Sequence, residues 1–376
     1  MPPRKSKANK SQQDIDAGAV AAEQLQAQFP KVNLPVAPPF PPMEAKSVEE
    51  IPSGADWQYE PKWDGFRCVA FRDGATVALQ SKSGQPLDRY FPEVVKAFID
   101  LPHQKFVLDG EIVIEREGRL SFDDLLMRIH PAASRIRRLS SETPATFLAF
   151  DLIVDEHGKS LIHVPLHARR ASLELFFKPI GSLARIQLSP ATTDRATAVQ
   201  WMSELAGAGF DGVVAKELAA AYASGERTAM RKIKRIKTAD CVVGGFRWAA
   251  KGGEVGSLLL GLYDQDGLLH HVGFTSGFSG EQRKELKQIL KPYTGGVGFT
   301  GRAPGGPSRW STERSGEWER LDPKLVCEVQ YDHFSDDRFR HGTRFLRWRP
   351  DKEPGKCTFE QVRIAPAKFT ELMRAA

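Results

Sequence analysis

The sequence of 376 residues predicts two domains, an α+β domain followed by a small β-barrel. Over residues 46–237, short apolar strands alternate with a few helices, such as residues 90–101 and 193–208. This stretch lacks the regular βαβ alternation of a doubly wound sheet. The remaining chain reads as strands separated by Gly-rich turns, with one helix near Gly280–Leu290. A chain of this length can bury two cores, so we place the boundary near Lys237.

Residues 1–30 are expected to form a disordered basic tail. The segment begins with four basic residues, Arg4, Lys5, Lys7 and Lys10, and continues rich in Gln and Ala, with a short helix over residues 17–28. Residues 34–43 are so rich in proline that they can form neither a helix nor a central strand. They should therefore lie extended across the first domain, which we assign to residues 31–237.

The second domain, residues 238–376, is predicted to be a barrel of the oligonucleotide-binding (OB) type. Its expected strands are residues 241–246, 257–263, 268–274 and 325–331. About five strands with a single helix are typical of this small barrel. Residues 295–315 are rich in Gly, Pro and Ser and are expected to form a flexible loop.

Composition favours an anionic partner. The formal net charge is +6 and the sequence pI is about 9.0, and the basic residues cluster along the chain. The four cysteines contain no Cys-x-x-Cys pair, which argues against a zinc site. No apolar run reaches the length of a membrane span, and no apolar core follows the basic start. We therefore expect a cytoplasmic, nucleoid-associated protein with no membrane partner.

Lys62, in the run Glu60-Pro61-Lys62-Trp63-Asp64-Gly65-Phe66-Arg67, is the candidate covalent nucleophile. A lysine attacks only as the free amine, so its site must lower its pKa by burial or by neighbouring positive charge. The Asp64-Gly65 turn would leave Lys62 at the floor of a cleft. Lys-x-Asp-Gly alone occurs by chance in roughly one chain in ten of this length, so the motif needs support from elsewhere.

That support comes from further motifs that follow in a fixed order. Residues 107–114 form an apolar strand interrupted by Asp109-Gly110-Glu111, and residues 147–153 form another that carries Phe150 beside an acid. The later motifs are Asp211-Gly212-Val213-Val214-Ala215-Lys216, Arg231-Lys232-Ile233-Lys234 and Arg349-Pro350-Asp351-Lys352.

This ordered set resembles the covalent nucleotidyltransferase superfamily and, within it, the ATP-dependent DNA ligases. Residues 60–67 and 339–347 are similar to stand-alone small bacterial ligases and to the ligase domain of bacterial non-homologous end-joining ligase D. The resemblance extends from about Leu34 to the end of the chain. It implies an adenylation domain of antiparallel sheets with flanking helices, followed by an OB-fold domain.

The resemblance also implies a reaction. Lys62 would attack the α-phosphorus of ATP to give a lysyl-AMP enzyme, AMP would pass to a DNA 5′-phosphate, and the 3′-hydroxyl would displace it. Asp64, Lys232 and Lys234 are its other expected catalytic residues. In a strand, Lys232 and Lys234 face one way, where they would hold the α-phosphate and depress the pKa of Lys62. The alternative is a solvated basic strand.

Magnesium or manganese fits this chemistry because both prefer hard oxygen ligands. The resemblance places Glu111 near the ribose and the metal, and Asp211 as a metal carboxylate. Aspartate stands at position 211 where the family often has glutamate, which would shift a direct contact toward a water-mediated one. The plain alternative for each acid is a turn or cap residue.

Nucleotide contacts are implied at further positions. Phe150 would stack on adenine, with an ordinary core phenylalanine as the alternative, and Glu60 would contact the adenine edge. Lys82 stands where the family commonly has arginine, so it keeps the charge without the bidentate fork. The complete set of expected nucleotide-binding residues is Glu60, Arg67, Lys82, Glu111, Phe150, Lys216, Arg349 and Lys352.

Other functions remain open on the sequence. RNA end joining or mRNA-type capping could use the same fold, and a non-catalytic DNA-binding protein could retain it. An NAD-dependent ligase is disfavoured because no four-cysteine zinc cluster is present. We expect a monomer that acts on nicked or broken double-stranded DNA, in excision repair or in end joining with a Ku-type partner.

Overall fold

The structure, a computed structural model, describes residues 27–130, 132–180, 185–204, 210–249, 253–305, 317–335, 337–340 and 342–363, together with Phe369 and Met373. The chain divides into two compact units. The first comprises Met1–Lys234 and Pro366–Ala376, and the second comprises Arg235–Ala365. Most of the predicted basic tail and of its helix over residues 17–28 lies outside the described residues.

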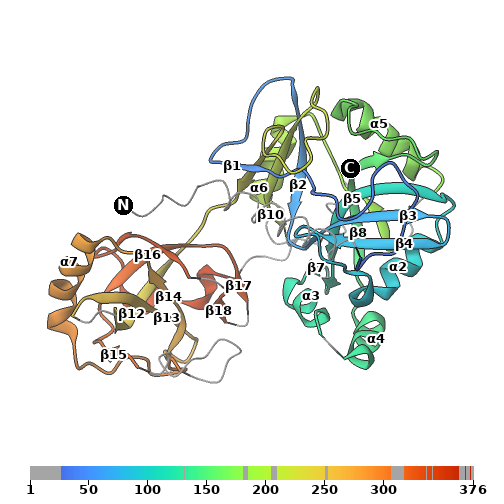
Figure 1. Ribbon diagram of the computed structural model, residues 1–376. Helices are drawn as coiled ribbons and strands as arrows, with labels where there is room; N and C mark the ends of the chain where they lie inside the picture. Colours follow the sequence, from blue (N-terminus) through green and yellow to red (C-terminus); the bar gives the residue numbers. More distant parts are fainter. Residues whose placement is uncertain are drawn as a thin grey trace, which may run out of the picture. The chain divides into compact units, whose positions relative to one another are not determined.

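Two sheets of mainly antiparallel strands form the first unit (Figure 1). One has the order β4-β3-β5-β8-β9 and the other the order β1-β11-β10-β2. Only the β1–β11 and β8–β9 pairs are parallel among the pairs of these two sheets that the structure describes. The strands are β1 (Lys46–Val48), β2 (Trp57–Trp63), β3 (Phe66–Asp73), β4 (Thr76–Ser81), β5 (Lys105–Val113), β8 (Thr146–Val154), β9 (Ile186–Leu188), β10 (Phe210–Glu217) and β11 (Met230–Lys234), with a separate hairpin of β6 (Glu115–Arg116) and β7 (Arg119–Leu120).

Helices flank the five-stranded sheet (Figure 1). Aromatic side chains of these helices and of the sheet share one buried hydrophobic cluster. The phenyl ring of Phe98 packs edge-on against that of Phe147, with centroids 5.0 Å apart. Proline at position 92 suits the first turn of its helix, where an amide hydrogen has no intrahelical partner. The helices of the first unit are η1 (Asp88–Tyr90), α2 (Pro92–Ile99), α3 (Phe122–Arg128), α4 (Ala133–Glu142), α5 (Leu166–Phe177) and α6 (Arg195–Glu204), of which α6 contacts β2 and β10 of the other sheet.

The proline-rich segment, residues 34–43, crosses the first unit as the sequence predicts. It contains neither helix nor strand, although all its residues are described. Val36 and Met43 are buried in a cluster with residues of β3 and β4. The side-chain amide of Gln80 both accepts from Phe40 N and donates to Phe40 O, at 2.7 Å each. This segment, called the strap below, is therefore fixed to the sheet by packing and by paired hydrogen bonds.

The second unit is a closed barrel. Its sheet has the order β14-β13-β12-β16-β19, and an isolated bridge between Thr275 and Thr343 joins the two edges. One helix follows the third strand of the barrel, which is the OB arrangement. The elements are β12 (Lys237–Trp248), β13 (Val255–Tyr263), β14 (Leu269–Ser276), α7 (Gly280–Leu290), η3 (Lys291–Tyr293), β15 (Glu319–Arg320), β16 (Val326–Tyr331), β17 (Phe334–Ser335), β18 (Arg338–Phe339), β19 (Arg344–Trp348), η5 (Pro354–Lys356) and η6 (Phe359–Gln361).

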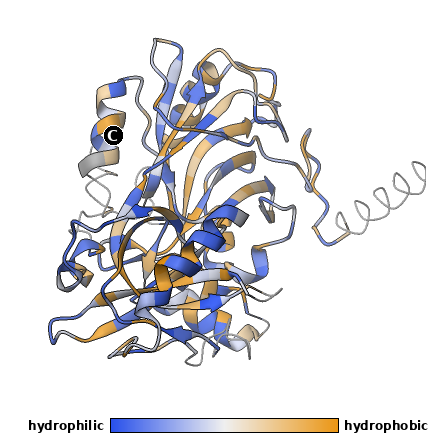
Figure 2. Ribbon diagram, turned by 90° about the vertical axis from the view of Figure 1, so that its left-hand side faces the viewer, coloured by the Kyte–Doolittle hydropathy of each residue, from blue (hydrophilic) through white to orange (hydrophobic). Residues whose placement is uncertain are grey.

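The predicted α+β class with a following OB-type barrel is confirmed. Hydrophobic residues run along the central strands (Figure 2), because a strand covered on both faces buries nearly every side chain. Helix α7 begins where expected because Ser279 and Gln282 form a capping box. The expected loop over residues 295–315 lies partly outside the described residues.

The C-terminal residues differ from the sequence-based division, which placed residues 238–376 together. Phe369 packs within the first unit, where its backbone N–H donates to Gly118 O at 2.7 Å. Its ring meets that of Trp63 edge-on, with centroids 5.7 Å apart. Phe369 is 4% exposed, so this aromatic side chain is part of the buried core of the first unit.

Candidate active site

A pocket in the first unit collects most of the predicted site residues. Strands β2, β3, β5, β8, β10 and β11, together with the strap, contribute to its wall. The predicted residues that line it are Glu60, Lys62, Arg67, Lys82, Glu111, Phe150, Lys216 and Lys232. Both sheets therefore supply functional side chains to a single cavity.

Lys62 lies near the end of β2 and forms an ion pair with Asp211. Its Nζ lies 3.0 Å from Asp211 Oδ2, and the two side chains are 22% and 11% exposed. Burial alone would lower the pKa of Lys62, but Asp211, Glu111 and Asp64 outweigh burial and raise it. The sequence-based expectation of a lowered pKa, produced by neighbouring lysines, is wrong for this structure. The reason is that three carboxylates surround the amine.

The Asp64-Gly65 turn connects β2 to β3 in a space that has no room for a side chain. A Cβ atom on Gly65 would lie 2.3 Å from Ile112 O and 2.8 Å from Glu111 Cγ. Gly65 thus permits the turn to approach β5, which carries Glu111. The glycine of the motif consequently sets how close Lys62 and Glu111 come to each other.

Two carboxylates, Glu111 and Asp211, adjoin the nucleophile from different sheets. Burial raises the pKa of Glu111 to about 7, although the charges of Arg67 and Lys62 act to lower it. Gly212, next to Asp211, has φ of +157°, and a Cβ there would lie 2.0 Å from Ile233 O. These acids supply the hard oxygen donors that a divalent cation prefers.

The two lysines of β11 differ in their surroundings. Ile233 between them is buried in the core with Tyr59 and Val213, as strand alternation predicts. Lys232 lines the pocket, and burial followed by the charges of Lys82 and Lys62 lowers its pKa. Lys234 is exposed and is not part of the pocket wall. Of these two lysines, only Lys232 therefore lines the pocket.

Arg67 is engaged by protein groups rather than left open for a phosphate. Its Nε and Nη2 both donate to the Asp109 carboxylate at 2.6 Å, and Nη2 also donates to Met43 O. Tyr222 donates its hydroxyl to the same carboxylate and accepts from Met43 N. Arg67 therefore holds the strap beside the pocket, and its predicted contact with substrate would compete with this network.

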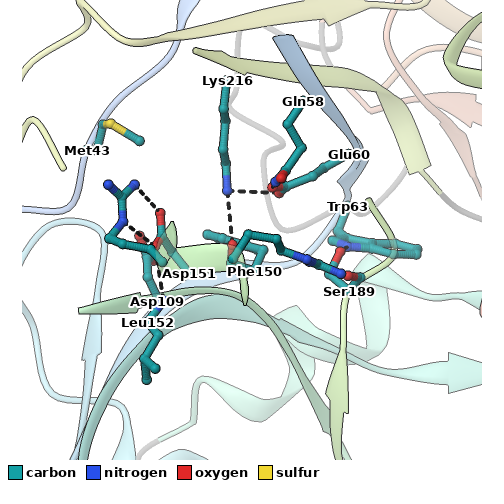
Figure 3. Close-up of polar contacts among 12 residues, drawn as sticks. Met43, Gln58, Glu60, Trp63, Asp109, Phe150, Asp151, Leu152, Ser189 and Lys216 are labelled. Atoms are coloured by element: carbon teal, nitrogen blue, oxygen red, sulfur yellow. Dashed lines mark hydrogen bonds and ion pairs between the residues drawn. The ribbon is translucent and has the colours of Figure 1, made fainter. Parts of the chain in front are cut away.

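Phe150, Glu60 and Lys216 line another part of the pocket, and the buried Gln58 contacts Glu60 (Figure 3). Glu60 Oε1 accepts from Gln58 Nε2 at 2.7 Å, and Glu60 Oε2 lies 2.9 Å from Lys216 Nζ. Lys216 also donates to Phe150 O at 3.2 Å. Phe150 is 7% exposed, and the Arg67 guanidinium carbon lies 4.5 Å and Lys216 Nζ 4.6 Å from the centroid of its ring. Two cations thus adjoin the aromatic ring that was predicted to stack on adenine.

Lys82 is the most exposed of the predicted residues on the pocket wall. Its ammonium lies 3.2 Å from Glu44 Oε2, and its side chain is 59% exposed. Arg227 pairs with the same oxygen at 2.9 Å. Glu44, which directly follows the strap, therefore gathers two cations at the edge of the pocket. A surface pair of this kind is weak enough to exchange its partner for a phosphate.

Arg349 and Lys352 belong to the second unit, where Asp240 holds them. Arg349 Nη1 lies 2.8 Å from Asp240 Oδ1, and Lys352 Nζ lies 3.5 Å from Asp240 Oδ2. Arg349 also bonds to Asp351, which keeps the pKa of that carboxyl low, at about 2. The predicted C-terminal motif is thus a single charged cluster, organised by an aspartate on β12.

The sequence-based reasoning missed Gln58, Asp109, Asp240 and Glu44 as partners of the predicted residues. A signal existed for Gln58 alone, because residues 58, 60 and 62 alternate along one strand and so face the same way. Each of the other three contacts a residue that is distant in the sequence, and local sequence patterns do not predict such pairs.

The four cysteines are buried as free thiols, two of them on facing positions of β12 and β16. Within the described part of the chain, no helix is both long and apolar enough to cross a membrane.

Two family models match the sequence. The "ATP dependent DNA ligase domain" matches residues 42–234, and the "ATP dependent DNA ligase C terminal region" matches residues 251–352. The first of these ranges contains every predicted site residue of the pocket. The second contains the Asp240 partners Arg349 and Lys352.

Individual ligases are similar to this chain over most of their own length. DNA ligase C1 of Mycolicibacterium smegmatis is 42% identical over 88% of this chain and 96% of its own. DNA ligase C of Mycobacterium tuberculosis is 44% identical over the same shares. Among solved structures, the ligase domain of M. tuberculosis LigD is 27% identical, covers 85% of this chain and 98% of its own, and has a TM-score of 0.43.

Proposed function

Because this chain belongs to the ATP-dependent DNA ligases, we propose that it seals nicks in duplex DNA through a lysyl-AMP intermediate on Lys62. One observation carries the proposal. Lys62 lies in a pocket together with Lys232 and Glu111 and contacts Asp211, so a nucleophile, a phosphate-binding cation and two carboxylates meet at one place. The phosphates of ATP and DNA bring several negative charges close together. A site that acts on them therefore catalyses mainly by positioning the reacting groups and by electrostatic stabilisation.

In the first step, Lys62 Nζ attacks the α-phosphorus of ATP. A nitrogen–phosphorus bond forms, the bond to the bridging oxygen breaks, and pyrophosphate leaves. Lys62 must first lose a proton, and Asp211 is the carboxylate that lies within hydrogen-bonding distance of its amine. Lys232 lines the same pocket, which supports a role for its charge in offsetting negative charge that builds up on the α-phosphate.

In the later steps, the DNA 5′-phosphate displaces Lys62 from AMP, and the 3′-hydroxyl then displaces AMP to restore the phosphodiester. The amine of Lys62 is the leaving group of the second step, so its tendency to regain a proton favours departure. The carboxylates that raise its pKa here promote this release.

A divalent cation, Mg²⁺ or Mn²⁺, fits the residues present. Glu111 and Asp211 offer carboxylate oxygens from two different sheets, and both act on the charge of Lys62. These residues would hold the ion. When bound, such an ion neutralises charge on the phosphates.

The test is incubation with α-labelled ATP and Mg²⁺ or Mn²⁺, followed by denaturing electrophoresis of wild type beside Lys62→Ala. Label on wild type alone, which then passes to a nicked duplex and disappears on sealing, supports the proposal. GTP in place of ATP, and an all-RNA nick in place of DNA, test for capping and RNA joining. Absence of label from wild type freed of bound AMP would reject the covalent step.

A further inference from the structure

Three buried polar side chains, Gln58, Glu60 and Lys216, form one hydrogen-bonded set beside Phe150 (Figure 3). They are 4%, 2% and 2% exposed. We propose that Gln58 and Lys216 fix the Glu60 carboxylate as an acceptor that selects a purine with a 6-amino group over one with a 6-oxo group. This inference rests on the proposed function and on the contact between Glu60 and the adenine edge that the family resemblance implies. What it adds is the role of Gln58 and Lys216 in positioning Glu60.

The hydrogen-bond inventory of Glu60 defines what it can recognise. An ionised carboxylate only accepts, and its two oxygens offer about four lone-pair sites. Gln58 occupies a site on one oxygen and Lys216 a site on the other. Glu60 also lines the pocket, so its free sites can accept from a ligand. The 6-amino group of adenine donates, whereas a 6-oxo group is a second acceptor that the carboxylate repels.

The backbone places both clamping residues together. Gln58 and Lys216 are directly opposite each other in the β2–β10 ladder, and Glu60 is opposite Val214. Lys216 donates further to Phe150 O on β8, which connects the set to the other sheet. Three strands from two sheets therefore hold one carboxylate, and a group held before the ligand arrives loses little freedom on binding.

The charge of Lys216 explains why a carboxylate is tolerated at this depth. A buried anion without a partner is strongly unfavourable, whereas one with a cation and a further hydrogen bond is compensated. Gln58 carries no charge, so its role is to fix orientation. Without its amide donor, the carboxylate of Glu60 could rotate away from the 6-position of the base.

The experiment compares lysyl-nucleotide formation from α-labelled ATP and α-labelled inosine triphosphate, whose base carries a 6-oxo group. We expect Gln58→Met to lower the ATP-to-ITP rate ratio roughly tenfold, as suits one hydrogen bond to a charged group. Glu60→Gln should lower it further, because an amide can both donate and accept. Purine riboside triphosphate, with nothing at position 6, should fall between ATP and ITP in wild type.

Gln80→Met is the matched control. Gln80 is a buried glutamine of the same unit whose side-chain hydrogen bonds go to the backbone of Phe40 and Ser81 rather than to Glu60. The Gln80→Met variant should lose stability as Gln58→Met does, but it should keep the wild-type ATP-to-ITP rate ratio. A purely structural role for Gln58 predicts the same unchanged ratio in both variants.

The outcomes separate the two proposals. An unchanged ratio in folded Gln58→Met and Glu60→Gln, both still labelled by ATP, overturns the inference and leaves the proposed function standing. If Gln58→Met does not fold, Gln58→Asn carries the test, because it retains the amide but shortens its reach by one methylene. A wild type labelled by no nucleotide overturns the proposed function instead.

Discussion

Lys62 Nζ and Asp211 Oδ2 are 3.0 Å apart, across 149 residues of sequence. This ion pair holds the proposed nucleophile in its charged, unreactive form, because Asp211 is the carboxylate that does most to raise its pKa. Activation of Lys62 therefore requires that the carboxylate be drawn elsewhere or accept the proton.

We expect Asp211→Asn to lower the pKa of Lys62 and so make its amine more reactive toward an acylating reagent at pH 8. The removal of the nearest negative charge is the physical cause. Mass-spectrometric measurement of Lys62 modification across pH tests this. Asp100→Asn, which removes the partner of the exposed Lys96, is the control and should leave Lys62 unchanged. Identical titration of Lys62 in Asp211→Asn and wild type would contradict the account.

The two lysines of β11 should contribute unequally. Lys232→Ala should slow adenylation on the order of a hundredfold, as expected for loss of a charge aimed at a developing anion. Lys234→Ala should slow it less, because Lys234 is exposed and lies outside the pocket wall. Single-turnover adenylation as a function of ATP concentration measures both. A larger effect at Lys234 would show that the pocket lined by Lys62 and Lys232 is not the phosphate site.

Gly65→Ala should disturb both the fold and the site. The added methyl group would meet Ile112 O and Glu111 Cγ, and relief of that clash must displace the turn or β5. We expect a destabilisation of roughly 1–3 kcal/mol, measured by denaturant unfolding, with slower adenylation. Gly280→Ala is the control, since nothing lies within 4 Å of its Cβ position. If Gly65→Ala keeps the wild-type stability and adenylation rate, the turn can accommodate a methyl group.

The cluster on the second unit should act at one step. By resemblance to the family, Lys352→Ala should slow adenylation but leave sealing of pre-adenylated DNA intact. Asp240→Asn should reproduce part of this loss, because Asp240 holds both Arg349 and Lys352. Separate assays of the two steps provide the measurement. Equal losses at both steps would exclude a role confined to adenylation.

Acid should weaken the barrel through His271. Burial, followed by the charges of Arg338 and Arg247, lowers the pKa of this 8%-exposed histidine to about 3. The unfolded chain, with a histidine pKa near 6.5, binds the proton first, so stability is full above that pH and falls below it. The loss reaches about 2 kcal/mol by pH 5.

Hydrogen exchange at the β13 and β14 amides, corrected for intrinsic rates, should therefore show about thirtyfold less protection at pH 5 than at pH 7. His271→Phe should remove this dependence, and the exposed His157→Gln should retain it. A dependence that persists in His271→Phe would place the acid-sensitive group elsewhere.

Local pattern predicted much of the architecture. Helix α7 and the strands of the barrel follow from residue periodicity and from caps such as Ser279, which act within a few residues. The strap followed from proline, which excludes helix by its own geometry. The C-terminal residues were placed in the wrong unit, because burial of Phe369 beside Trp63 depends on a contact that no local pattern encodes.

Residue types, the order of the motifs and the family resemblance predicted which residues would carry the proposed chemistry, among them Lys62, Glu111, Lys216 and Lys232. Strand alternation predicted that Ile233 enters the core between Lys232 and Lys234. The protonation and the hydrogen-bond partners of these groups depend instead on contacts between segments that are distant in the sequence. Asp211 raises the pKa of Lys62, Asp109 accepts hydrogen bonds from Arg67, and Asp240 pairs with Arg349. The first two pairings span 149 and 42 residues. Electrostatic energy depends on distance in space, and that distance is set only when the strands assemble.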